Sequence, residues 1–324
     1  MGKNFYLHYD FRAPSFGPPA ETLYGAALEQ CAWGETVGFN EVVISSHHGC
    51  DDNYGPSTLV SAAAIAARTS KLGIVPVVVP TLGDPIRLAE DIATADLISG
   101  GRLEVAVGAG YRQAEFDMFG VDISERGRLM DEALIAMRSA WTGEPFEFRG
   151  RTVMVRPRPA QPGGPKIAVC GFSKAAARRA ARLGDGYMPM AGTDPIDTYT
   201  AECAKLGKQP NVQRVVDWMF LYVTEDPERA WQQLAPHLLH VSNSYAKWMA
   251  DANATMVYQP ASDVSALQGI GTFEVVTPAE AIELAKGSHN IIVDPLFGGC
   301  PPELAEPSLE LIATKVIPAF RGAL

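Results

Sequence analysis

The sequence predicts an α/β protein built as a (β/α)8 barrel, also called a TIM barrel. Apolar segments typical of buried strands alternate with segments of helical periodicity along most of the 324 residues, and eight such strands can be placed. The third strand is apolar on both faces, as the strands of a covered parallel sheet must be. The chain length is that of one such barrel.

The first half of the chain supplies four strands, each followed by a helix. The strands are expected at residues 5–11, 41–45, 72–80 and 103–107, and the helices at about 21–37, 56–69, 84–100 and 125–141. Asp84-Pro85 is a typical N-terminal pair for the third helix, and Gly100-Gly101 ends it. Pro76 predicts an irregularity inside the third strand, because proline donates no ladder hydrogen bond.

The second half continues the alternation with two insertions. Strands are expected at 166–170, 185–190, 212–224 and 290–295, with helices at 173–183, 194–207, 226–240 and 302–320. A hairpin-like segment, residues 142–165, follows strand four, and an irregular or helical insertion, residues 241–271, follows strand seven. Thr277 and Glu280 then form a capping box. We expect one domain over residues 1–324; a doubly wound sheet is the alternative, because the sixth strand is poorly defined.

Composition excludes several function classes. The chain has 27 Lys and Arg against 37 Asp and Glu, a net charge of -10, which disfavours nucleic acid and anionic membranes as partners. Its five cysteines are widely spaced and indicate neither a disulfide framework nor a zinc ribbon, so a reducing compartment is expected. No apolar signal segment or membrane-spanning run is present in the sequence. We expect a cytoplasmic protein that acts on a small molecule.

Two adjacent histidines mark the first candidate site. A β-branched strand runs into His47 and His48, and strand ends are where β/α barrels build their active sites. Imidazole titrates at about pH 6.5, so either residue can accept or donate a proton. The alternative is a structural histidine bound to a backbone carbonyl. A metal site is not indicated, because neighbours on a strand point to opposite faces and no further ligand motif accompanies them.

Glycine-containing loops after other strands give a second candidate site. Gly108-Ala109-Gly110 follows the fourth strand, but Gln113 stands where the third glycine of a dinucleotide fingerprint would fall. We expect instead that the glycines let the backbone pass close to a planar ligand. Gly171-Phe172-Ser173 leads a strand into a helix, which is either a phosphate-binding turn or an ordinary capped helix. Together with Gly298-Gly299, these loops predict a phosphate-bearing cofactor at the barrel mouth.

Several motifs are distributed over nearly the whole chain. The most specific are residues 84–91, 97–103, 108–111, 115–116 and 119–120, and further ones are 141–145, 148–150, 173–186 and 308–311. These motifs resemble those of the bacterial luciferase-like family of flavin-dependent barrel enzymes. The resemblance implies a barrel fold, an oxidoreductase and a homodimer.

The resemblance also implies roles for individual residues. His47 matches the histidine that acts as an acid/base near the flavin in the luciferase-like monooxygenases, with His48 as its neighbour. Val77, Val78 and Val79 match the segment whose backbone supports the isoalloxazine ring, commonly through a non-proline cis peptide. Gly171, Phe172 and Ser173 match the phosphate-binding turn.

Two departures from the family pattern leave the cofactor open. Ser46 replaces a glutamate, and Ala109 replaces an arginine that grips the flavin phosphate, although Arg112 can supply that charge. Gly-Ala-Gly followed by an aromatic residue is similar to the branch that uses the deazaflavin coenzyme F420. Taken as a whole, the resemblance implies first a monooxygenase that uses O2 and reduced FMN from a separate flavin reductase. The alternatives are an F420-dependent oxidoreductase that transfers hydride and a non-catalytic flavin-binding barrel.

The sequence predicts only the chemical class of the substrate. Residues 50–54 and the insertion 241–271 are expected to shape the pocket, and Tyr245, Trp248, Met249 and Met256 favour a small, fairly apolar organic compound. The alternative is that these side chains cover a small core of the insertion itself.

Overall fold

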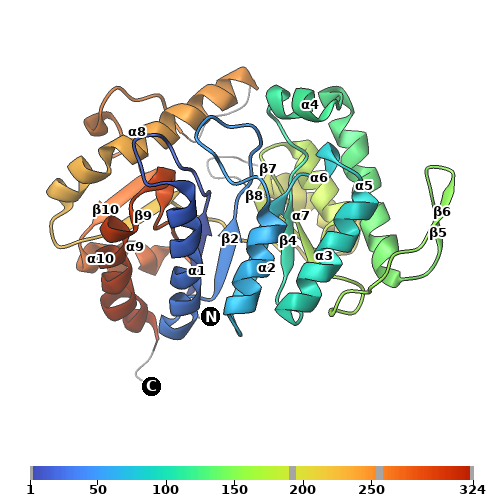
Figure 1. Cartoon of the computed structure of the whole chain (residues 1–324), viewed down its shortest axis with the longest axis horizontal. Coiled ribbons are helices and arrows are strands. Elements are labelled where there is room, and N and C mark those ends of the chain that lie inside the picture. Colours follow the sequence, from blue (N-terminus) through green and yellow to red (C-terminus); the bar gives the residue numbers. More distant parts are fainter. Residues whose placement is uncertain (1–2, 190–194, 253–257, 322–324) are drawn as a thin grey trace. The chain divides into compact units, whose positions relative to one another are not determined.

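The computed structural model describes residues 3–189, 195–252 and 258–321, and Figure 1 follows the chain from blue to red. Residue contacts divide the chain into two compact units. Unit 1 comprises Met1–Pro56 and Val215–Leu324, and unit 2 comprises Ser57–Arg214.

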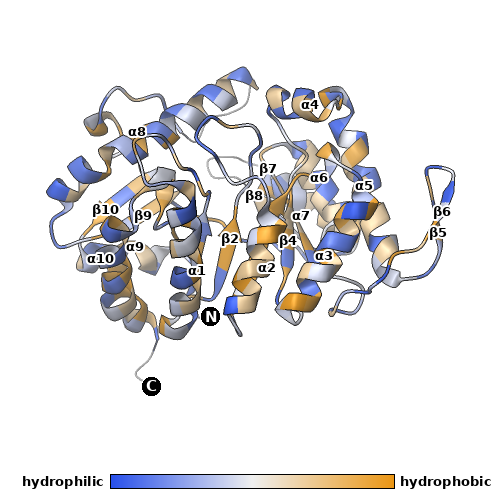
Figure 2. Cartoon of the chain, in the orientation of Figure 1, coloured by the Kyte–Doolittle hydropathy of each residue, from blue (hydrophilic) through white to orange (hydrophobic). Residues whose placement is uncertain are grey.

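Unit 1 contains three neighbouring parallel strands and a separate parallel pair. β1 (Asn4–Tyr9) lies between β11 (Asn290–Val293) and β2 (Glu41–Ile44), with Leu7 opposite both Val293 and Val42. β9 (Phe220–Val223) pairs with β10 (Phe273–Val276). Buried apolar side chains fill these strands, and Figure 2 shows most of β2 in the hydrophobic colour. Such strands require cover on both faces.

Helices flank the strands of unit 1. They are α1 (Ala20–Val37), α8 (Pro227–Asp251), α9 (Pro278–Gly287) and α10 (Pro302–Leu311), with short turns η3 (Val264–Ala266), η4 (Phe297–Gly299), η5 (Ile312–Val316) and η6 (Ile317–Phe320). Asp226 caps α8, and the capping box predicted at Thr277 and Glu280 is present at the start of α9.

Two predictions for unit 1 are wrong in their boundaries. Strand seven was expected from residue 212, but β9 begins at Phe220, and the segment predicted as an insertion from residue 241 begins as the last three turns of α8. α8, orange in Figure 1, continues past residue 240 with Val241 in a core that includes Phe220 and Phe273, and with Tyr245 packed against that core. β10 was missed altogether, since a strand of only four residues that includes Glu274, after a glycine-rich stretch, is a weak signal.

Unit 2 contains four parallel strands in the order β3-β4-β7-β8. They are β3 (Gly73–Val78), β4 (Glu104–Val107), β7 (Lys166–Gly171) and β8 (Gly186–Pro189). The helices are α2 (Thr58–Arg68), α3 (Pro85–Ser99), α4 (Gln113–Phe119), α5 (Arg126–Thr142), α6 (Lys174–Leu183) and α7 (Ile196–Lys205), with turns η1 (Pro80–Leu82) and η2 (Ile123–Glu125). Parallel strands separated by helices confirm the α/β class.

Details of unit 2 follow the sequence closely. Asp84 caps α3 through hydrogen bonds from the backbone N–H groups of Ile86 and Arg87. The weak sixth strand is confirmed as β8, which pairs with β7. Pro76 separates an isolated bridge at Ile74 from the β3–β4 ladder that starts at Val77, as expected for a residue without an N–H group. Met190 and Asp194, predicted as a strand end and a helix cap, lie outside the described residues.

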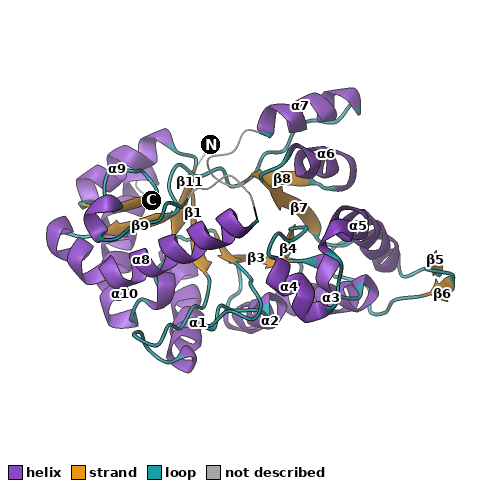
Figure 3. Ribbon diagram, turned by 90° about the horizontal axis from the view of Figure 1, so that it is seen from above, coloured by secondary structure: helices purple, strands orange, loops and turns teal. Residues whose placement is uncertain are grey.

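The hairpin predicted within residues 142–165 is confirmed. β5 (Phe146–Phe148) and β6 (Arg151–Val153) pair antiparallel and form a sheet of their own. Figures 1 and 3 both show this hairpin standing away from the helices of unit 2. In the part of the chain that the structure describes, no helix is long and apolar enough to cross a membrane.

Candidate functional site

His47 lies in unit 1 just beyond the carboxyl end of β2, inside a box of aromatic rings. Its ring centroid is 4.9 Å from that of Tyr54 and 4.9 Å from that of Trp248, and Tyr245 lies at 6.0 Å. The His47 residue is only 9% exposed, whereas its neighbour His48 is half-buried. Tyr245 and Trp248 of α8 therefore pack on the predicted acid/base, and Tyr245 also packs on the core that contains Tyr258 and Phe273. Met256 lies outside the described residues.

Arg12 holds this aromatic box together. Its guanidinium carbon lies 4.6 Å from the ring centroid of Tyr54, 5.0 Å from that of Tyr245 and 4.8 Å from that of Trp248. Such cation–π contacts are strongest where water is excluded, and the Arg12 side chain is fully buried. Arg12 thus joins the segment after β1 to α8 and to the loop after β2.

The charge of Arg12 is balanced by two carboxylates. Nε of Arg12 lies 3.2 Å from Oδ2 of Asp10, and its Nη1 donates to Oδ2 of Asp52. His240 on α8 also contacts Asp52, with 2.7 Å between Nε2 and Oδ2. Burial would raise the pKa of Asp52, but the hydrogen bond with His240 and the charge of Arg12 lower it to about 2. Asp52 is therefore ionised at neutral pH.

A second polar cluster lies at the ends of β1, β2 and β11. Nδ1 of His8 is 2.6 Å from Oδ2 of Asp294, and Nε2 of His8 is 2.7 Å from Oγ of Ser45. Sequence reasoning missed this cluster. The available signal was the alternation of polar His8, Asp10 and Arg12 with aromatic residues in a strand-like run. Within the described residues, no group of three or more His, Cys, Asp and Glu is arranged to hold a metal ion.

The predicted cofactor loops of unit 2 come together at the carboxyl ends of its strands. Oγ1 of Thr81, after β3, donates to the carbonyl of Ala109, after β4, at 3.1 Å. The aromatic rings of Tyr111 and Phe172 meet edge to face at 6.1 Å. The Tyr187 hydroxyl donates to the carbonyl of Gly171 at 2.5 Å. The loops after β3, β4 and β7 are thereby fixed to their neighbours by side-chain contacts.

This part of unit 2 has the features of a site for a planar ligand with a phosphate. A Cβ atom built on Gly108 would have no atom within 4 Å, so space is open beside the end of β4. Ser173 caps α6 by accepting from the N–H of Ala176 at 3.1 Å, and Lys174 is exposed in the first turn. A helix N-terminus with a free first turn favours an anion.

Two features of unit 2 bear on the expected cofactor contacts. Arg112, expected to supply charge for a phosphate, has its Nη1 3.0 Å from Oε1 of Glu115, and both side chains are largely buried. Its charge is therefore already compensated. The described residues have a cis peptide bond at Arg156-Pro157 and none at Val77–Val79, where the family pattern implied one.

Comparison with known proteins decides the family. Residues 11–274 match the model for the luciferase-like monooxygenases. The chain belongs to the luciferase-like monooxygenase family. The motif-based resemblance is confirmed, and the luciferase-like match includes both His47 of unit 1 and the glycine loops of unit 2.

Luciferase-like relatives of both cofactor types match this chain. It is 31% identical over 176 residues to an FMNH(2)-dependent dimethylsulfone monooxygenase of Pseudomonas putida, covering 51% of this chain and 47% of that protein. It is 29% identical over 245 residues to an F420-dependent glucose-6-phosphate dehydrogenase of Nocardia farcinica, covering 65% and 71%. The chain spans about half the length of the first curated relatives it matches.

The fold is shared with a solved monooxygenase, RslO1 from Streptomyces bottropensis. The TM-score is 0.77 at 23% sequence identity, and the match covers 98% of this chain and 99% of that one. At this identity the likeness establishes the fold alone.

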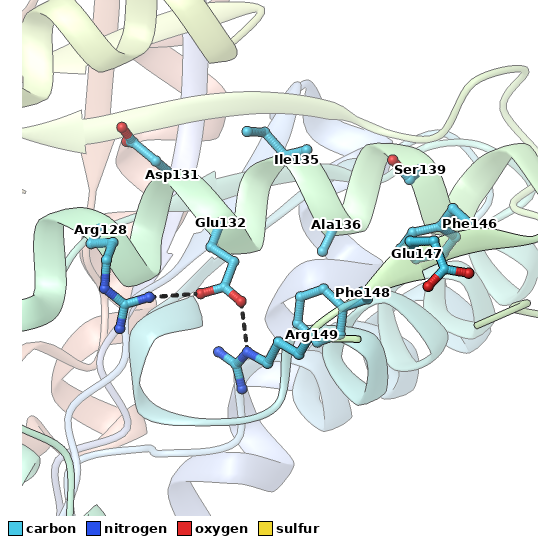
Figure 4. Close-up of a pocket in the computed structure, with 10 residues that line it drawn as sticks. All are labelled: Arg128, Asp131, Glu132, Ile135, Ala136, Ser139, Phe146, Glu147, Phe148 and Arg149. Carbon is cyan, nitrogen blue, oxygen red and sulfur yellow. Dashed lines mark hydrogen bonds and ion pairs between the residues drawn. The ribbon is translucent and has the colours of Figure 1, made fainter. Parts of the chain in front are cut away.

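A separate groove of about 500 Å³ lies in unit 2 between α5 and the hairpin (Figure 4). Ile135, Ala136, Phe146 and Phe148 give it an apolar lining. At one end, Glu132 accepts hydrogen bonds from Arg128 at 3.1 Å and Arg149 at 2.6 Å, and Figure 4 shows both. None of the predicted site residues lines this groove.

Proposed function

We propose that the protein is the oxygenase of a two-component flavin-dependent monooxygenase. It would use O2 and reduced FMN from a separate reductase to oxygenate a small, fairly apolar organic compound inside a (β/α)8 barrel. The observation that carries the proposal is His47, an acid/base candidate at the end of β2 within an aromatic box. FMN-dependent monooxygenases among the relatives support the same chemistry.

The residues of unit 2 would hold the cofactor. The backbone of Val77, Val78 and Val79 and the loop Gly108-Ala109-Gly110 would face the ring system, and Gly171-Phe172-Ser173 would take the phosphate at the N-terminus of α6. When bound, reduced flavin supplies the electrons that activate oxygen.

The residues of unit 1 would manage protons and exclude water. His47 would take up or release one proton at a ring nitrogen, because an imidazole titrates near neutral pH. The rings of Tyr54, Tyr245 and Trp248 surround it and keep its environment apolar. Arg12 positions those rings without touching the substrate.

A second function, F420-dependent hydride transfer, rests on a specific observation. Ala109 stands where the resemblance to luciferase itself places an arginine on the flavin phosphate, and Arg112, which could replace that charge, is paired with Glu115. An F420-dependent dehydrogenase is among the relatives. In this function His47 would serve as acid or base during hydride transfer, and no O2 would be consumed.

A cofactor titration separates the two functions. FMN and F420 are added separately to the purified protein, and binding is followed by fluorescence quenching and calorimetry. We expect tighter binding of FMN. Gly108→Val tests where the cofactor binds. The new side chain fills open space at a position without a backbone constraint, so stability should stay unchanged while cofactor binding weakens by about tenfold or more. Preference for F420 would replace the first function by the second, and binding of neither would contradict both.

Substitution of His47 tests the catalytic role. His47→Ala should lower turnover by about 10²–10⁴-fold, the usual contribution of a positioned acid or base, while the cofactor still binds. His48→Ala is the matched comparison and should have a smaller effect, because His48 is half-buried whereas His47 is buried. Turnover that survives in His47→Ala would remove His47 from the mechanism. A homodimer is also expected, and size-exclusion chromatography with light scattering tests it.

A further inference from the structure

Unit 1 contains a continuous chain of three side chains that the role of His47 does not use. Oγ of Ser45 lies 2.7 Å from Nε2 of His8, and Nδ1 of His8 lies 2.6 Å from Oδ2 of Asp294. Each imidazole nitrogen therefore has one partner, a hydroxyl on one side and a carboxylate on the other. The same order of groups transfers protons in hydrolases with a serine, histidine and aspartate triad.

Three adjacent strands place these groups. Leu7 of β1 pairs with Val293 of β11, so His8 and Asp294 are each one position further along neighbouring strands. His8 itself pairs with Val43 of β2, two residues before Ser45. Side chains two apart on a strand point to the same face, which directs Ser45 towards His8. The cluster therefore occupies the carboxyl ends of the strands, where β/α enzymes carry out their chemistry.

Burial distinguishes the Ser45-His8-Asp294 cluster from an ordinary structural network. The Asp294 side chain is 1% exposed, and its Oδ1 has no hydrogen-bond partner among the described residues, so within them the carboxylate bonds His8 through one oxygen. A purely structural network would satisfy both oxygens, since a buried unpaired acceptor costs about 1–3 kcal/mol. The His8 side chain keeps 14% exposure and Ser45 is half-buried, so the hydroxyl end of the chain is the accessible one.

We propose that Ser45, His8 and Asp294 form a proton relay that ends on an oxygen atom of the substrate, a small compound with a carbonyl or hydroxyl group. The proposal rests on the oxidoreductase function argued above. Ser45 would be the catalytic residue that touches the substrate, and His8 and Asp294 would be positioning residues. The relay could act with either cofactor. In both the oxygenation and the hydride transfer, a substrate oxygen that belongs to the reacting group gains or loses a proton.

The proton step balances without a further reactant. In the donating direction, the Ser45 hydroxyl gives its proton to the substrate oxygen, and Nε2–H of protonated His8 gives a proton to Ser45. One N–H bond breaks on His8 and one O–H bond forms on the substrate, while Ser45 is restored. Asp294 stays hydrogen-bonded to Nδ1–H throughout and stabilises the imidazolium. The accepting direction reverses these transfers.

The charges around His8 favour a proton on its imidazole ring. Burial would lower the pKa of His8, but the charge and hydrogen bond of Asp294, with the charge of Asp10, raise it above its ordinary value. Burial also raises the pKa of Asp294, to about 6. The other ionisable groups that act on this pair are Asp10, Arg12, Tyr9, Tyr258 and Cys300. The charge of Asp10 raises the pKa of Asp294 and the charge of Arg12 lowers it, while the raised pKa of His8 favours a protonated imidazole.

The first test needs no cofactor. Histidine side chains are labelled with ¹³C and ¹⁵N, and His8 is titrated by NMR in the wild type and in Asp294→Asn. We expect the pKa of His8 to lie above its ordinary value in the wild type and below it in the variant. A His8 that titrates at or below its ordinary value in the wild type would overturn the relay. This outcome leaves the role of His47 untouched, because that role is tested by the turnover of His47→Ala.

The second test probes the substrate class with three compounds of one carbon skeleton. Cyclohexanone and cyclohexanol, added at millimolar concentration, should shift the His8 resonances of the wild type, and cyclohexane should not. The response should disappear in Ser45→Ala, return in Ser45→Thr, which restores the hydroxyl, and persist in the control Ser46→Ala. A response that is the same for all three compounds, absent for all three, or retained in Ser45→Ala would contradict the proposal. Loss of turnover in His47→Ala with an unresponsive His8 would leave the proposed function standing without the relay.

Discussion

The candidate groups of the two units have opposite chemical character. In unit 1 they are buried ionisable side chains, with Arg12 and two carboxylates in contact and His8 paired with Asp294. In unit 2 they are glycines, open backbone and the first turn of α6. Proton transfer needs charges whose pKa values are set by burial and partners, whereas a planar phosphate-bearing ligand needs backbone without side chains. The contrast is consistent with the proposed function, in which unit 1 handles protons and unit 2 holds the cofactor.

The largest expected effect is on the charge network of unit 1. Arg12→Ala leaves Asp10 and Asp52 buried without their cation, which should lower the unfolding free energy by about 3–5 kcal/mol. Arg87→Ala is the control, since that side chain is 71% exposed and its ion pair with Asp91 should contribute less than about 1 kcal/mol. Urea denaturation measures both. Equal losses of unfolding free energy in the two variants would mean that burial does not determine how much an ion pair of unit 1 contributes to stability.

The next effect concerns pH and Asp294. Its pKa is about 6 in the native state against an ordinary 3.8, so between pH 4 and 6 the native state binds more protons than the unfolded state. Stability therefore falls as pH rises through this window, by about 3 kcal/mol for this group. Asp52, with a pKa of about 2, titrates below the window.

The Asp294→Asn variant removes this dependence. It cannot ionise at position 294, so its unfolding free energy should rise relative to that of the wild type between pH 4 and 6. The loss of a raised pKa at His8 acts in the same direction, because a neutral buried His8 is favoured at higher pH. Denaturation curves at pH 4, 5, 6 and 7 give the difference. Parallel pH profiles for the two proteins would contradict the assignment.

A smaller effect tests the backbone character of unit 2. Gly110 has φ of 77°, and a Cβ there would lie 2.8 Å from the Phe116 ring. Gly163 has φ of 79° with nothing within 4 Å, so it shows the backbone strain alone. Gly110→Ala should destabilise by about 1–2 kcal/mol more than Gly163→Ala. If thermal unfolding shows equal losses, close packing does not explain the glycine at position 110.

The smallest effect tests whether the Ser173 hydroxyl at the start of α6 serves as a helix cap or as a ligand for phosphate. Ser173→Ala removes the hydrogen bond to Ala176 and should cost about 1 kcal/mol of stability. Ser57→Ala is a matched control, because Ser57 precedes α2 without a side-chain capping bond. Calorimetry with inorganic phosphate should still detect the α6 site in Ser173→Ala, since backbone N–H groups remain. Complete loss of phosphate binding would show that the hydroxyl, not the backbone, is the ligand.

Local signals in the sequence predicted most elements. The β-branched run before His47 gives β2, the Asp84-Pro85 pair begins α3, and the capping box at Thr277 begins α9. The boundaries that failed depend on distant contacts. α8 continues to Asp251 because its inner face meets Phe220 and Phe273, which no local pattern specifies.

The sequence by itself determined the α/β class, the hairpin, the family and the position of His47 at a strand end, because periodicity, caps and motifs are properties of neighbouring residues. The tertiary structure decided which side chains act on one another. His8 and Asp294 are 286 positions apart and Asp52 and His240 are 188 apart, yet each pair is in hydrogen-bond contact. Strand order and helix packing create such pairs, and the pKa of each group follows from its partner and its burial.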